Sequence, residues 1–105
     1  MISATEIYRT FACATQAKLD IFVDVEVAMA RAEVENDAHM LKSSAGTFGF
    51  NELADIAAEL ERDACNISEP ELREFGHRLQ TAFIYEKADF ERHFGSCRLQ
   101  DSCLV

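Results

Sequence analysis

Apolar residues recur every three or four positions in the middle of the chain, and this spacing constrains the fold more than any other feature. The repeat runs through Val34, Ala38, Leu41, Ala45 and Phe48. On an α-helix these residues fall within an arc of about 80°. The pattern therefore predicts a helix that begins near residues 29–31 and buries one face. Gly49 suits the C′ position that ends such a helix.

Two helices are predicted before this one. The first covers about 3–14, with an apolar stripe of Ile7, Tyr8, Phe11 and Ala14. The second covers about 16–28, with Leu19, Phe22, Val23, Val27 and Met29 apolar. Residues 23–27 alternate as a strand would, but an isolated strand would have no partner, so a helix is the better interpretation.

Two helices are predicted after it. One starts from Asn51 as N-cap, ends near Cys65, and carries Leu53, Ile56, Ala57 and Leu60 on one face. The other starts at a capping box of Ser68 and Glu71, with Pro70 in its first turn. Its apolar stripe runs through Leu72, Phe75, Leu79, Phe83, Phe90 and Phe94. Helices with short connections and one apolar stripe each predict an all-α antiparallel bundle.

Length and composition fit one helical domain over 1–105, with a tail after about residue 95 that we expect to be frayed. The net charge of −9 makes nucleic acid and anionic membranes poor partners. No stretch of 18 uncharged apolar residues and no signal-peptide core occurs. The four cysteines (Cys13, Cys65, Cys97 and Cys103) have no C-x-x-C spacing, which indicates free thiols and a cytoplasmic location rather than a metal or redox motif.

His39 is the candidate functional residue. It lies roughly 140° from the centre of the apolar arc, on the side of the helix that also carries Glu35, Lys42, Ser43 and Gly46. Neutral imidazole is a nucleophile that can hold a phosphoryl group, and a lysine one turn away can neutralise the phosphoryl oxygens. The alternative is a solvated histidine beside an unrelated lysine.

Gly46 bears on that choice, because glycine inside an exposed helix costs about 1 kcal/mol relative to alanine. Two explanations remain open. Another protein approaches this face closely, or a neighbouring helix packs against it.

The run Ala38-His39-Met40-Leu41-Lys42-Ser43-Ser44-Ala45-Gly46-Thr47-Phe48-Gly49-Phe50 resembles the motif of the histidine-containing phosphotransfer (HPt) family, Ala-His-x-Leu-Lys-Gly-x-Ala-Gly with a further glycine. It is also similar to the phosphoacceptor domain of chemotaxis histidine kinases. The resemblance implies a four-helix bundle with an additional N-terminal capping helix.

By this resemblance, His39 accepts a phosphoryl group at Nε2 and Lys42 stabilises it. Glu61, late in the next helix, bonds Nδ1–H and so orients the ring. Glu35, Ser43 and Gly46 belong to the face on which partners dock. Ser43 departs from the pattern, which has glycine after the lysine. Two consequences stay open: the serine alters the approach of a receiver domain, or its hydroxyl adds a hydrogen bond.

The resemblance also implies a phosphoryl carrier of two-component phosphorelays that is no enzyme and no kinase by itself. The chain has no Gly-rich phosphate loop. Its partners would be a sensor histidine kinase and response-regulator receiver domains, whose aspartate pocket supplies Mg²⁺. The chain itself would need no cofactor or metal and would be a monomer. The kinase, the receiver and the direction of transfer are not specified by the sequence.

Three alternatives stay open. Glu74-x-x-His77 has the spacing of di-iron bundles, and Asp89 and His93 lie one turn apart, but only one clear copy of the motif occurs. An adaptor that keeps the bundle without transfer is disfavoured by the presence of both His39 and Lys42. A phosphoacceptor domain detached from a larger kinase is also conceivable; the initial Met and the expected frayed end favour a free-standing protein.

Overall fold

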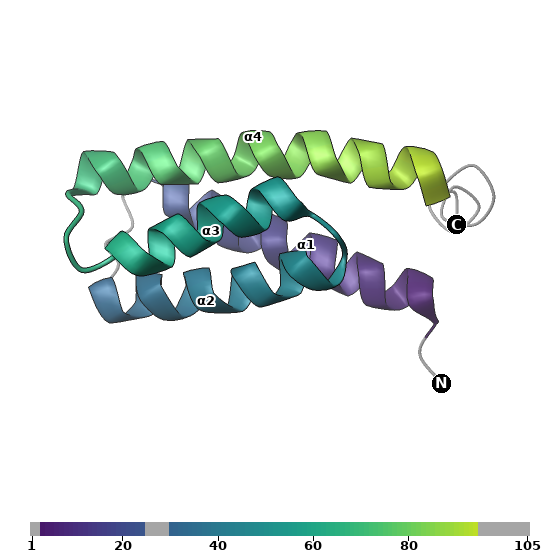
Figure 1. The fold of residues 1–105 in the computed structure, drawn as a ribbon, viewed down its shortest axis with the longest axis horizontal. Coiled ribbons are helices and arrows are strands. Elements are labelled where there is room, and N and C mark those ends of the chain that lie inside the picture. Colours follow the sequence, from purple (N-terminus) through teal and green to yellow (C-terminus); the bar gives the residue numbers. More distant parts are fainter. Residues whose placement is uncertain (1–2, 25–29, 95–105) are drawn as a thin grey trace.

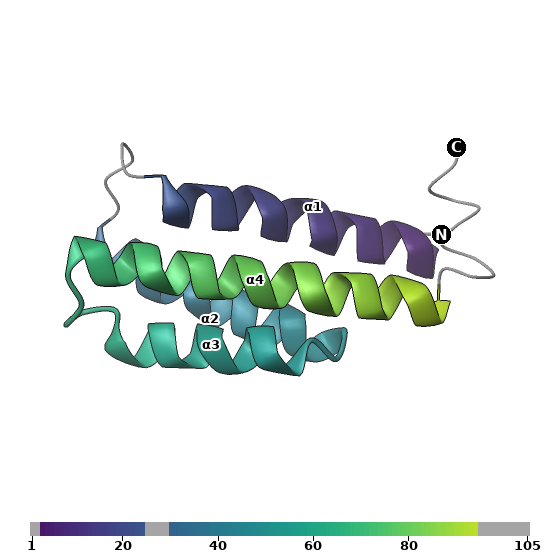
Figure 2. The same cartoon turned by 90° about the horizontal axis from the view of Figure 1, so that it is seen from above.

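Four α-helices make up the part of the chain that the structure describes. The structure is a computed structural model, and it describes residues 3–24 and 30–94. The helices are α1 (Ala4–Val23), α2 (Arg31–Thr47), α3 (Asn51–Asp63) and α4 (Glu69–Phe94). Successive helices run in opposite directions, and α1 and α4 extend beyond α2 and α3 at one end (Figures 1 and 2). The predicted all-α antiparallel four-helix bundle is confirmed.

The two helices expected over 3–14 and 16–28 are one helix, so there is no separate capping helix before the bundle in the described residues. The hydroxyl of Ser3 caps α1 by accepting a hydrogen bond from the Glu6 N–H at 3.1 Å. Thr15, where a break was expected, is buried in the core, and no glycine or proline interrupts the hydrogen-bond ladder there. The helix ends at Val23. Residues 25–28 of the expected second helix, and Met29, lie outside the described residues.

The buried stripe of α1 also differs from the expected one. Because the helix continues past residue 15, its core face is set by Tyr8, Phe11, Ala12, Thr15, Leu19 and Phe22. Ile7 and Ala14, which were expected to be buried, lie roughly 90–110° from the centre of that face and are exposed. They line a groove between α1 and α2 instead.

Aromatic side chains fill the bundle where α1 and α4 extend past the other helices. Tyr8 of α1 stacks on Phe90 of α4 with ring centroids 4.5 Å apart, and Phe11 stacks on Phe48 at the same distance. Phe50 and Phe83 contact the same group of rings. The Tyr8 hydroxyl donates to Glu91 at 2.8 Å, so its polar atom is satisfied. This packing holds the C-terminal end of α2 in the bundle.

The turn between α2 and α3 contains two helix ends that are stabilised differently. Local hydrogen bonds end α2, whereas a side chain of α4 stabilises the start of α3. Gly49 has a φ of +76°, and the N–H of Phe50 donates to the Ala45 carbonyl at 2.8 Å. This arrangement is a Schellman cap, as the position of Gly49 predicted. Asn51, however, is not the N-cap: α3 follows Phe50, which is buried, and the Glu86 carboxylate of α4 accepts from the N–H groups of Glu52 and Leu53.

The ends of α4 and α1 meet at the opposite end of the bundle. Ser68 and Glu71 form the predicted capping box, with reciprocal hydrogen bonds of 3.0 and 3.3 Å. Arg73 donates to the Phe22 carbonyl at 2.9 Å, which satisfies a terminal group of α1. Gly76 permits this close approach, since a Cβ there would lie 2.8 Å from Val23 Cγ1.

The cysteines and the apolar character of the helices can be compared with what the sequence predicted. Cys13 and Cys65 are exposed free thiols. Cys97, Cys103 and the tail after residue 95 lie outside the described residues. Among the described helices, none is both long and apolar enough to cross a membrane.

Candidate functional site

His39 stands on the outer face of α2 because its neighbours Ala38 and Leu41 are held in the core. Its imidazole is 58% exposed. The helical wheel therefore placed this side chain correctly. Exposure leaves the ring accessible to a second protein, while the buried face of α2 fixes its position on the bundle.

One carboxylate binds both candidate catalytic side chains. Glu61, near the end of α3, places Oε2 at 2.7 Å from His39 Nδ1 and Oε1 at 2.6 Å from Lys42 Nζ. The two helices pack side by side, so a residue 22 positions away in sequence reaches the histidine. The structure thus brings together the three residues that the sequence suggested, with Glu61 in the middle.

The charge of Glu61 fixes the protonation pattern of this triad. The hydrogen bond from Lys42, and then that from His39, lower the pKa of Glu61 below that of an ordinary glutamate. The carboxylate is therefore ionised at neutral pH and can only accept hydrogen bonds. Nδ1 must carry a proton to donate to it, which leaves the lone pair of a neutral ring on Nε2. No hydrogen bond to Nε2 is found among the described residues.

The other residues predicted for this face lie along α2 on both sides of His39. Glu35 is exposed, and its carboxylate is 3.8 Å from the Cys65 sulfur at the end of α3. The Ser43 hydroxyl donates back to the His39 carbonyl at 3.3 Å. The side chain of Ser43 therefore lies against its own helix. Serine in place of the glycine of the HPt pattern thus adds little steric bulk to the surface around His39.

Gly46 packs against no other part of the described chain. A Cβ added there would have nothing within 4 Å. Of the two explanations for this glycine, packing against a neighbouring helix is thus excluded for the described residues. Gly76 differs from Gly46 in this respect, because a Cβ at Gly76 would collide with α1. Gly76 is therefore required for helix packing.

Sequence reasoning missed an apolar groove beside His39. It lies between α1 and α2, has a volume of about 390 Å³, and is lined by Ile7, Ala14, Met40 and Ser44 among others. Met40 directly follows His39 and is 54% exposed. A flexible apolar side chain exposed on an otherwise polar helix face was a usable signal for this surface. Lys18, paired with Asp37 at 2.9 Å, also lines the groove.

The residues considered for a di-iron site do not converge. His77 lies in a groove between α3 and α4, whereas His93 bonds the Asp89 carbonyl one turn back on the surface. Within residues 3–24 and 30–94, no group of three or more His, Cys, Asp or Glu side chains is placed to hold a metal ion.

Comparison with known proteins gives one result. The family model described as "Hpt domain" matches residues 6–100 of the chain. No curated protein and no solved structure matches it.

Proposed function

Because the chain belongs to the Hpt domain family, we propose that His39 is the residue on which it carries a phosphoryl group, at Nε2. Hpt domains are histidine phosphotransfer modules of phosphorelay signalling, and they are carriers rather than kinases. The assignment to His39 is supported above all by one contact: Glu61 occupies Nδ1 at 2.7 Å and leaves Nε2 directed away from the hydrogen bond.

The proposed step is an attack by Nε2 on the phosphorus of an aspartyl phosphate in a receiver domain. The Nε2 lone pair forms the new N–P bond, and the P–O bond to the aspartate breaks with its electron pair leaving on the carboxylate. Nδ1 keeps its proton, so the ring becomes cationic as the bond forms. The Glu61 carboxylate faces that developing charge and stabilises it. Because both phosphorylated species are reactive, the step runs in either direction.

Lys42 is proposed to neutralise the phosphoryl oxygens. Its ammonium group bonds Glu61 at 2.6 Å while its side chain remains 39% exposed. An exposed lysine side chain can turn from the carboxylate toward an incoming phosphoryl group without leaving a buried charge unpaired. Charge neutralisation is a main contribution that a protein can make to phosphoryl transfer.

We propose that receiver domains dock over α2, with the apolar groove between α1 and α2 as part of the contact. The groove offers Ile7 and Met40 as exposed apolar residues, and Gly46 leaves clearance on the same helix. Glu35 and Ser43 would lie at the contact around His39. The Mg²⁺ that the step uses would be held by the partner's aspartate pocket, and a sensor kinase would supply the phosphate. Free thiols at Cys13 and Cys65 fit a cytoplasmic setting.

The test is phosphoryl uptake from a phosphorylated receiver domain. The full chain should acquire label that is labile in acid and stable in alkali, and His39→Gln should acquire none while keeping its helical circular dichroism. His77→Gln is the matched control, because His77 is equally a surface histidine of the bundle but lies on α4. Label that persists in His39→Gln, or disappears in His77→Gln alone, would refute the assignment.

A further inference from the structure

The outer face of α4 carries a regular stripe that no described helix covers. Its residues are spaced four, three, four, three and four positions apart, and all are exposed: Glu74, Arg78, Thr81, Tyr85, Ala88 and Arg92. Alternating steps of three and four are the spacing with which one helix packs along another. The helix packs on α1 and α3 through its other face.

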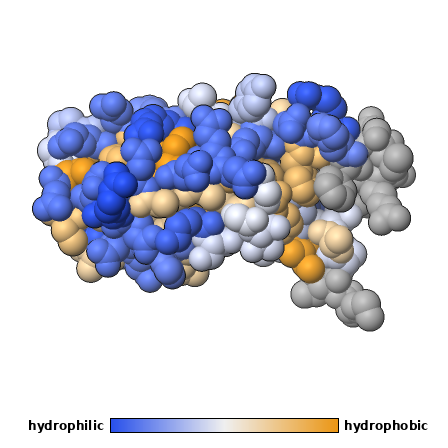
Figure 3. Space-filling view, viewed as in Figure 1, coloured by the Kyte–Doolittle hydropathy of each residue, from blue (hydrophilic) through white to orange (hydrophobic). Residues whose placement is uncertain are grey.

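A large apolar side chain stands near the centre of this stripe, and a second one lies next to it on the helix. Tyr85 is 72% exposed and its neighbour Ile84 is 65% exposed, which makes them the most exposed large hydrophobic side chains of the described chain. Elsewhere the face formed by α3 and α4 is largely polar, with small apolar areas between the charged groups (Figure 3). Ile84 points roughly 100° away from Tyr85 around the helix, so Tyr85 is the large apolar side chain that the stripe itself offers to a partner.

The stripe is complementary to itself when a second copy of α4 lies antiparallel across it. If the two-fold axis passes beside residue 83, Glu74 lies opposite Arg92 of the second copy, and Thr81 lies opposite its Tyr85. Each of these pairs occurs twice, as an isologous interface requires. A parallel arrangement would instead place like charges opposite each other. Glu74 makes no hydrogen bond or ion pair within the described chain, and Arg92 has only an exposed contact of 3.4 Å with Asp89.

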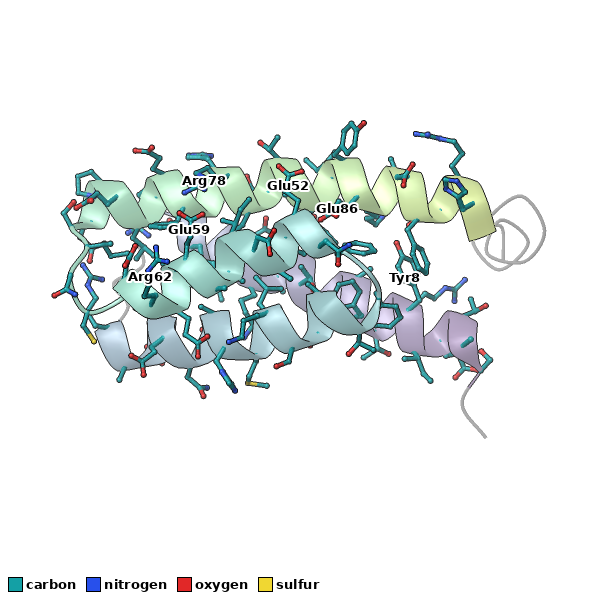
Figure 4. The ribbon with its side chains drawn as sticks, in the orientation of Figure 1. Tyr8, Glu52, Glu59, Arg62, Arg78 and Glu86 are labelled. Atoms are coloured by element: carbon teal, nitrogen blue, oxygen red, sulfur yellow. The ribbon has the colours of Figure 1, made fainter. Side chains whose placement is uncertain are left out.

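A groove lies where the second copy's tyrosine would fall. It runs between α3 and α4, has a volume of about 530 Å³, and is lined by Ile56, Thr81 and Ala82 together with charged residues. In Figure 4, Arg78 of this groove lies beside Glu59, with which it forms an ion pair, and Glu52 of the groove lies beside Glu86, whose carboxylate accepts from the Glu52 backbone N–H. Thr81 belongs both to this groove and to the stripe. A phenol ring opposite Thr81 therefore meets a concave surface with an apolar floor.

We propose that this protein associates with a second copy of itself through α4, with Tyr85 of each copy at the α3–α4 groove of the other. The site on α2 remains open in both copies, because α2 lies on the side of the bundle away from α4 (Figure 1). Because only one helix and one groove of each copy take part, we expect the dimer to be weak and concentration-dependent. The inference replaces the monomer expected from the sequence and does not rest on phosphotransfer.

Sedimentation equilibrium of the full chain tests this. The average mass should rise with concentration from 11.8 kDa toward twice that value. Tyr85→Glu should weaken the association at least about tenfold, because it puts an acidic group at an apolar contact in both copies. Ile7→Glu is the control: it changes an exposed apolar residue in the other groove, 50% exposed against 72% for Tyr85, and association should persist.

The charge pair gives a second, independent measurement. Glu74→Arg and Arg92→Glu should each weaken association, and the double variant should restore it, since the opposed pair is then only reversed. A mass of 11.8 kDa at every concentration, loss of association in Ile7→Glu but not in Tyr85→Glu, or no rescue by the double variant would overturn the proposal. His39→Gln should still associate, and Tyr85→Glu should still take up phosphate. Failure of the dimer proposal would therefore not count against phosphoryl transfer on His39, nor the reverse.

Discussion

Glu61 Oε2 lies 2.7 Å from His39 Nδ1, and the other oxygen of the same carboxylate lies 2.6 Å from Lys42 Nζ. One side chain on α3 therefore sets both the proton position of the histidine and the resting position of the lysine on α2.

Replacing Glu61 should slow phosphoryl transfer without unfolding the bundle. Glu61→Gln retains one acceptor oxygen and presents an amide donor on the other side, so it cannot serve both His39 and Lys42. We expect transfer to slow by roughly ten- to hundredfold, and Glu61→Ala to slow it further. Single-turnover transfer from a phosphorylated receiver measures this. Glu59→Gln, on the same helix but paired with Arg78, is the control and should be unchanged.

Removing Lys42 should slow transfer and leave it measurable, since the lysine is not the nucleophile. A loss of about tenfold corresponds to ~1.4 kcal/mol of transition-state stabilisation, and Lys42→Arg should recover part of it. Lys87→Ala removes a lysine of similar exposure that pairs with Glu91 on α4, and should have no effect. Equal rates for Lys42→Ala and the parent chain would remove this residue from the mechanism.

Gly46→Leu should raise stability and lower transfer, an unusual combination. The new side chain points into open space, and the gain in helix propensity is worth about 0.5–1 kcal/mol in the free energy of unfolding. The same side chain fills the clearance beside His39 that a receiver domain needs. Urea denaturation and transfer kinetics measure the two effects.

Gly76→Ala is the matched control for Gly46 and should behave in the opposite way. Its Cβ would meet Val23 Cγ1 at 2.8 Å and the Phe22 backbone at 3.2 Å, so overpacking should cost roughly 1–3 kcal/mol of stability. Transfer by the folded fraction should stay normal. If Gly46→Leu transferred at the parent rate, close approach over Gly46 would be disproved; a gain of stability in Gly76→Ala would disprove the packing role of Gly76.

Ser43→Gly should change receiver affinity or transfer rate more than stability. The hydroxyl bonds only the His39 carbonyl of its own helix, so its loss costs about 0.5 kcal/mol, mostly through helix propensity. Affinity can be followed by titrating labelled receiver. If both kinetics and affinity are unaffected, the serine is neutral on the docking face.

The stabilising effect of the Glu61 contacts should disappear in acid. The folded state lowers the pKa of Glu61, so these contacts add stability above the ordinary glutamate pKa of about 4.5 and lose it as pH falls through the lower folded value. The stability difference between the parent chain and Glu61→Gln should therefore be constant near neutral pH and shrink in acid. In Lys42→Ala the loss should be smaller and should be complete at a higher pH, because Lys42 is the largest cause of the lowered pKa. A difference that persists undiminished in acid would contradict this.

Much of this protein follows from its sequence because the relevant signals are local. The spacing of Val34, Ala38 and Leu41 defines the buried face of α2 and therefore the exposure of His39. Gly49 and the capping box at Ser68 mark helix ends through contacts within a few residues. The position of Glu61 came from resemblance to a family, and the structure places it against His39.

The tertiary structure decided what depends on residues far apart in the chain. The continuity of α1 through Thr15 is set by burial against other helices, and this shift in the buried face left Ile7 in a groove instead of the core. The start of α3 is stabilised by Glu86, more than thirty residues later, and not by Asn51. That one carboxylate serves both His39 and Lys42 is likewise invisible in a local pattern, because it results from the packing of α3 on α2. The sequence by itself determined the all-helical class of the fold, the buried face of α2 and the exposed histidine; packing between helices determined the course of α1 and what surrounds the histidine.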